Sequence, residues 1–258
     1  MMRTSILLIV LSLFLAGCGS VEHKAPVRSS EAEAAFQLVQ NAEGRKDDAA
    51  RADLRSALGV FEALDDRPGR WAASAALANW HIAQREVETG AAYSRQAFEL
   101  APHTNSTHAM YESSLQLGQL TQDRDIILSA MPHAQNALET AVIHVLLNDH
   151  AAATQALAAY EQPANASRAE NAARAFVLYR LGKHNGDKAL VIEALKHYRL
   201  AADVYGVTDS LFLAATLETS PAAALELAQR ALLSARQSGE PSRITVIAQW
   251  LALKGSQQ

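Results

Sequence analysis

Cys18 is the one cysteine of the 258-residue chain, and its thiol could act as a nucleophile, a redox group or an attachment point, or lie buried in a core. An apolar run of about 11 residues, from Ile6 to Ala16, comes directly before it. Arg3 and the amino terminus supply positive charge ahead of this run. A helix needs about 20 apolar residues to span a bilayer, so the run is typical of the hydrophobic region of a signal peptide. The position of the cysteine therefore favours an attachment point at a processing site.

The four residues that end at this cysteine, Leu15-Ala16-Gly17-Cys18, resemble the lipobox of bacterial lipoproteins. The resemblance implies that the thiol of Cys18 is alkylated with diacylglycerol, that the peptide is cut between Gly17 and Cys18, and that the new amino group is acylated. Two or three acyl chains would anchor the protein firmly, because each buried CH2 contributes about 0.8 kcal/mol and one chain binds only marginally. Gly19 is not the aspartate that retains such lipoproteins in the inner membrane. The resemblance thus implies an anchor in the outer membrane, on its periplasmic face.

Other residue patterns that carry chemistry are few. The chain contains neither the His-Glu-x-x-His motif of metalloproteases nor the Gly-x-Ser-x-Gly elbow of hydrolases. The segment from Gly182 to Lys188 has glycines and lysines without the spacing that cradles a phosphate, so we interpret it as a turn. Two histidine pairs, His103 with His108 and His144 with His150, bracket helix ends without carboxylates at ligand spacing. The sequence therefore predicts no catalytic residue, no cofactor and no metal site.

The charge of the chain argues against nucleic acid as a partner. The formal net charge is −4, and removal of residues 1–17 would leave 22 Lys and Arg against 27 Asp and Glu. Nucleic-acid binding needs clustered cations, which this balance does not favour. With one cysteine there is no second thiol for a disulfide, so stability must come from packing.

The body of the chain has the composition of helices. Ala and Leu dominate, and no alternating strand pattern bounded by turns is present. Ser29 or Ser30 is expected to cap the first helix. Glycine, proline and Asn-Asp breakers recur at even spacing and predict helix pairs at 30–43 with 47–66, 70–86 with 88–101, 104–120 with 122–131, 134–148 with 150–161, 165–182 with 187–205 and 207–218 with 221–237, and a last helix at 241–254.

One of these pairs, from Ser74 to Pro102, resembles a tetratricopeptide repeat. Leu77 and Ala78 occupy the large and small positions of its first helix, Gly90 the position where the helices cross, Ala97 the alanine of the second helix, and Pro102 the end. The segment departs from the repeat pattern at Ser74, His81 and Ser94. Weaker echoes of the second helix occur at 151–160, 194–206 and 222–236. The resemblance implies an all-α fold, a right-handed α-solenoid of roughly six such helix pairs and a terminal helix.

These patterns predict three parts of the chain. Residues 1–17 are expected to be a lipoprotein signal peptide, residues 18–29 a lipidated N-terminus and tether, and residues 30–258 a helical domain of tetratricopeptide-like repeats.

The resulting hypothesis is a lipid-anchored envelope scaffold without enzymatic activity. It would bind polypeptide partners of the envelope in the groove lined by the first helix of each pair. The candidate partner-binding residues, chosen by their helix positions, are Asn79, Ile82, Tyr111, Gln116, Thr140 and His144. The combination of a lipobox and about six repeats also resembles the pilotins of type IV pilus secretins and lipoprotein adaptors of peptidoglycan hydrolases and envelope proteases.

Two alternatives stay open at this point. One is an enzyme or a periplasmic lipoprotein that binds a small ligand or metal in a pocket between helices, with His103, His108 and Tyr111 as polar groups. The other is a purely structural envelope protein.

Overall fold

The computed structural model describes residues 29–255, and the regular secondary structure in this range is all helix, without a strand. Thirteen α-helices follow one another in packed pairs, an arrangement compatible with an α-solenoid, which confirms the predicted all-α fold class. The predicted signal peptide, the cleavage site at Gly17 and the lipidation of Cys18 lie outside the described residues. The contacts divide the described chain into two compact units, residues 29–135 and residues 136–255.

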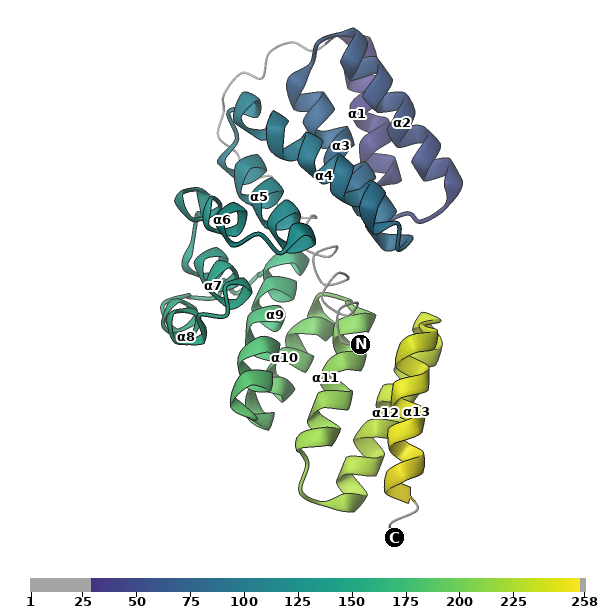
Figure 1. The fold of residues 1–258 in the computed structure, drawn as a ribbon, viewed down its shortest axis with the longest axis vertical. Helices are drawn as coiled ribbons and strands as arrows, with labels where there is room; N and C mark the ends of the chain where they lie inside the picture. The colour runs from purple at the N-terminus through teal and green to yellow at the C-terminus, as the bar shows by residue number, and fades with distance from the viewer. Residues whose placement is uncertain (1–28, 256–258) are drawn as a thin grey trace. The chain divides into compact units, whose positions relative to one another are not determined.

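The first unit contains three helix pairs (Figure 1). In chain order its elements are α1 (Ser30–Ala42), α2 (Asp48–Ala63), α3 (Arg67–Ala83), α4 (Val87–Leu100), the 3-10 turn η2 (Ala101–Thr104), α5 (Thr107–Thr121), α6 (Arg124–Leu128) and the 3-10 turn η3 (Met131–His133). Each helix packs on the next, and the first helices α1 and α3 also contact each other. The core between α1, α2 and α3 is built around Leu54, Phe61, Leu77 and Trp80.

The second unit contains three more pairs and a final helix (Figure 1). Its elements are α7 (Ala137–Leu146), α8 (His150–Ala158), α9 (Arg168–Asn185), α10 (Lys188–Leu200), α11 (Val204–Leu217), α12 (Pro221–Ser238) and α13 (Pro241–Gly255). The first helices α7, α9 and α11 contact one another in sequence, and α13 packs on α12. Two apolar clusters form the core, one around Tyr198 and Leu178 and one around Leu195, Leu211 and Ile247.

The observed pairs follow the predicted ones, with two shorter helices. Ser29, one of the two predicted caps, accepts a hydrogen bond from the amide of Ala32 and begins α1. The helix predicted over 122–131 is only α6, because the chain turns at Ser129 and then forms a 3-10 turn that contains Pro132. The helix predicted over 150–161 ends at Ala158, ahead of the irregular segment around Pro163.

Most of the tight turns between helices share one conformation. A residue in the left-handed region ends one helix, and the acidic residue that follows begins the next. The amide of each acidic residue donates to the carbonyl five residues earlier, at 2.9 Å for Asp66 to Phe61 and for Asp203 to Tyr198. The left-handed and acidic residues are Asp65-Asp66, Arg85-Glu86, Gln122-Asp123, Asn148-Asp149, Gly186-Asp187, Ala202-Asp203 and Gly239-Glu240.

Candidate partner-binding face

The six residues predicted to bind a partner lie on the first helices of three successive pairs. Asn79 and Ile82 belong to α3, and Tyr111 and Gln116 to α5, all four in the first unit. Thr140 and His144 belong to α7, in the second unit.

Asn79 and Gln116 are joined by a hydrogen bond between two first helices. The amide nitrogen Nε2 of Gln116 donates to Oδ1 of Asn79 at 2.6 Å. Gln116 is only 2% exposed, whereas Asn79 is half-buried. A buried carboxamide needs such a partner, since an unsatisfied one costs about 1–3 kcal/mol. The bond therefore fixes the side chain of Asn79, which stays partly exposed where α3 meets α5. The Nδ2 group of Asn79 takes no part in this bond.

A second polar link joins the same two helices at Trp71. The indole nitrogen Nε1 of Trp71 donates to Oγ of Ser113 at 2.8 Å, and the indole is half-buried. Trp71 and Asn79 lie eight residues apart, about 12 Å along the same helix. Sequence reasoning did not place Trp71 among the partner-binding residues. The sequence signal that could have pointed to Trp71 is its position near the start of a helix, shortly after Pro68-Gly69.

Ile82 and Tyr111 are buried, at 5% and 8% exposure. Ile82 packs where α3 and α4 cross, because a Cβ placed on Gly90 would lie 2.8 Å from Cγ1 of Ile82. Gly90 is therefore needed for the close approach of the two helices. Ile82 is therefore buried because it packs in the crossing of α3 and α4.

Thr140 and His144 lie one turn apart on α7. The hydroxyl of Thr140 donates to the carbonyl of Asn136 at 3.2 Å, within its own helix. Nδ1 of His144 lies 3.7 Å from Oδ2 of Asp149, across the turn between α7 and α8. Both side chains are half-buried.

The histidines of the alternative hypothesis contact different residues. Nδ1 of His103 lies 3.3 Å from Nη1 of Arg67, and Nε2 of His108 lies 3.3 Å from Oε1 of Glu112. The side chain of His108 is 47% exposed, and partial desolvation lowers its pKa. Among residues 29–255 no group of three or more His, Cys, Asp and Glu side chains is placed to hold a metal ion.

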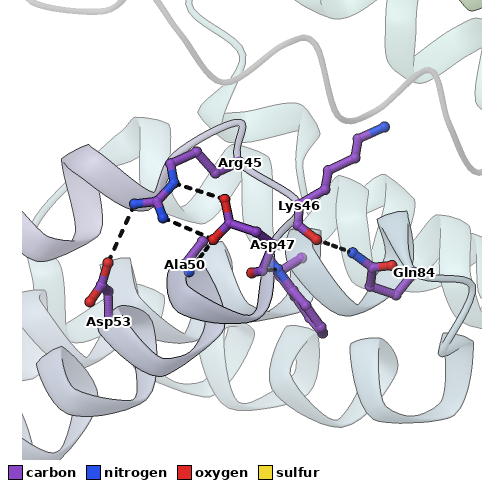
Figure 2. A network of polar contacts seen from close by, with 7 residues as sticks. Arg45, Lys46, Asp47, Ala50, Asp53 and Gln84 are labelled. Carbon is purple, nitrogen blue, oxygen red and sulfur yellow. Dashed lines mark hydrogen bonds and ion pairs between the residues drawn. The ribbon is translucent and has the colours of Figure 1, made fainter.

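The end of α3 that carries Asn79 is held by a polar network at the turn between α1 and α2 (Figure 2). Arg45 donates from Nη2 to Oδ1 of Asp47 at 2.8 Å, and this bond lowers the pKa of the Asp47 carboxyl. Oδ1 of Asp47 also accepts from the amide of Ala50 at 2.7 Å and so caps α2.

One side chain of α3 and one directly after it bind the backbone of that turn. Gln84 Nε2, just after α3, donates to the carbonyl of Lys46 at 2.6 Å (Figure 2). Nε1 of Trp80 donates to the carbonyl of Asp47 at 3.1 Å, and the guanidinium of Arg51 lies 4.9 Å from the Trp80 ring centre. The orientation of α3, and with it of Asn79, is thus set by contacts from the preceding pair.

No protein-family model matches the chain, and no curated protein matches it at a significant level. None of the helices within residues 29–255 combines the length and apolar character needed to cross a membrane.

Proposed function

We propose that the protein is a lipid-anchored scaffold of the bacterial envelope that binds a polypeptide partner on the face of α3 and α5. The observation that carries the proposal is the pair of polar links between these first helices, Trp71 to Ser113 and Asn79 to Gln116. They hold a half-buried indole and a half-buried carboxamide on one helix, in fixed positions.

This pair of side chains suits a polypeptide. A carboxamide can donate to and accept from a peptide backbone, and an indole offers a large apolar contact with few rotatable bonds. Because α3 is held from both sides, by Asp47 and Lys46 on one and by α5 on the other, little conformational entropy is lost on binding.

The anchor in this proposal is Cys18, supported by the lipobox that ends at this residue. Double or triple acylation would hold the chain on a membrane, and Gly19 supports the outer membrane as the destination. Within this class, a pilotin of a pilus secretin and an adaptor of a peptidoglycan hydrolase or envelope protease are the two narrower proposals. Pilus genes beside this gene would favour the first.

The experiment that tests the proposal is crosslinking in living cells followed by pulldown from detergent-solubilised envelopes. Wild type is compared with Cys18→Ala, and copurifying proteins are identified by mass spectrometry. We expect a discrete polypeptide with the wild type that is lost or mislocalised with the variant. Absence of any partner above the level of the variant would contradict the scaffold and direct attention to small ligands.

A further inference from the structure

Two histidine rings are stacked where helices α8 and α9 meet in the second unit. His150 is the first residue of α8, and His184 belongs to the last turn of α9. Their ring centres lie 3.8 Å apart, with 26° between the ring planes. Nδ1 of His150 is buried without a hydrogen-bond partner. The stack therefore brings two titratable groups from different helices into direct contact.

Positive groups outnumber negative ones around this stack. Arg180 lies one turn before His184 on α9, donates to Oδ1 of Asn148 at 3.4 Å and places its charge near His150. From α7, His144 faces Asp149 at 3.7 Å. The carboxylate of Asp149 is the one opposing charge at His150, and it also caps α8 by accepting from the amide of Ala152.

Lys183 precedes His184 in the last turn of α9, and Asp187 caps α10 three residues after His184. Helix α8 itself carries no other titratable residue.

Helix α8 packs mainly on its pair partner α7 and makes fewer contacts with α9. Of its nine residues only Ala153 is buried, and Leu157 is its one large side chain that packs on the core cluster of α9 and α10. Apolar burial contributes about 25 cal/mol per Å², so the small contact of α8 with α9, to which Leu157 adds a partly buried side chain, is held weakly. A modest electrostatic change at His150, the first residue of α8, can therefore weaken the contact of α8 with α9.

The surroundings of His150 disfavour its protonation. Burial lowers the pKa of His150, and the nearby His184 and Arg180 lower it further, against a smaller opposite effect of Asp149. The docked state then binds fewer protons than the undocked state. By linkage, docking is most stable above the ordinary histidine pKa and weakens as the pH falls through and below about 6.5.

We propose that the stack of His150 on His184 is an acid-sensitive joint that releases α8 from α9 when His150 becomes protonated. Protonation of His150 would place a positive charge on a ring that is stacked on His184 and lies near Arg180, and the apolar contact of α8 with α9 that opposes release is small. The proposal concerns a second region of the molecule and does not depend on partner binding at α3 and α5.

The test is hydrogen exchange by mass spectrometry on the full chain in detergent, at pH 7.5 and pH 5.5, with protection factors corrected for the intrinsic rates. We expect the protection of residues 150–158 to fall severalfold at the lower pH, while peptides of α10 and α12 change less. His184→Gln should remove most of this fall, and His103→Gln, which changes a histidine of the first unit, should leave it intact. Equal protection at both pH values, or a fall that His184→Gln does not alter, would overturn the proposal.

A second measurement does not require opening of the helix. The pKa of His150, followed by NMR of its ring protons, should rise in His184→Gln and in Arg180→Gln, because each substitution removes a positive neighbour. The Arg180 variant leaves both rings in place, so it also serves if His184→Gln fails to fold. A pKa of His150 that is unchanged in Arg180→Gln would contradict the electrostatic origin of the joint.

Discussion

The turn between α2 and α3 in the first unit and the turn between α10 and α11 in the second are built alike. In each, an aromatic ring near the end of one helix packs on a glycine in the first turn of the next: Phe61 on Gly69, and Tyr198 on Gly206. In each, the residue before the acidic cap has positive φ, 50° at Asp65 and 56° at Ala202. The aromatic and the glycine are eight residues apart in both cases.

The two turns differ in polarity at the same depth. Phe61 is fully buried and needs no partner, whereas the fully buried Tyr198 carries a hydroxyl without a hydrogen bond. The cap of the first turn, Asp66, is half-exposed, whereas Asp203 is buried, and burial raises the pKa of Asp203. We infer that the packing of the aromatic ring on the glycine and the acidic cap determine the conformation of this turn. The buried polar atoms of Tyr198 and Asp203 then lower the stability of the second turn relative to the first.

Removal of the aromatic ring should have the largest effect in both turns. Phe61→Ala and Tyr198→Ala are each expected to lower the free energy of unfolding by about 3–5 kcal/mol, because each leaves a cavity in a close-packed core. Urea unfolding followed by circular dichroism measures the loss. A loss below about 1 kcal/mol in either variant would show that the two turns are not equivalent.

Addition of a methyl group at the glycines should have the next largest effect. A Cβ on Gly69 or Gly206 would overlap the ring of Phe61 or Tyr198, so each Gly→Ala change is expected to cost about 1–3 kcal/mol. Gly59 is the matched control, because it lies exposed within α2 and a Cβ there meets no atom within 4 Å. Gly59→Ala should stabilise by about 0.5–1 kcal/mol, and destabilisation of equal size at all three glycines would refute the contact argument.

Removal of the hydroxyl of Tyr198 should make the second turn resemble the first. Tyr198→Phe keeps the ring on Gly206 and removes a buried polar atom without a partner, so we expect a gain of about 1 kcal/mol. The same urea titration measures it. A clear loss of stability would indicate that the hydroxyl has a partner, such as a buried water.

The smallest effect is expected from the cap of the second turn, and it depends on pH. Since the pKa of Asp203 is raised in the folded state, the folded chain binds more protons than the unfolded chain from about pH 3.8 up to the folded-state pKa, and over this window the group destabilises increasingly as the pH rises. Asp203→Asn keeps a good cap without the charge. It should raise the melting temperature at pH 7 and less so at pH 4, close to the ordinary pKa of an aspartate; an equal rise at both values would contradict the prediction.

The pairs of helices could be predicted from the sequence because their ends carry local signals. Ser29 caps α1, and Pro221 and Pro241 begin α12 and α13, as their residue types favour. Other ends could not be found this way. Arg85, Gln122 and Ala202 adopt positive φ, which no local preference of these residues favours; the packing of the flanking helices imposes it.

The candidate site was only partly predictable from the sequence, because its contacts also depend on how the helices pack. Helix position placed Asn79 and Gln116 on first helices, but their mutual hydrogen bond joins residues 37 apart in the chain. The stack of His150 on His184 likewise depends on how α8 meets α9. The handedness of the helix array and its relation to tetratricopeptide repeats stay predictions.

The most direct test of the scaffold is site-specific photocrosslinking in living cells. A benzophenone amino acid is placed at Trp71 or at Asn79 on α3, and at Thr89, an exposed residue of α4, as the control. We expect the two α3 positions to capture the same polypeptide and position 89 not to capture it. Capture at position 89 as strong as at the α3 positions, or no adduct at either α3 position, would contradict a partner-binding face on α3 and α5.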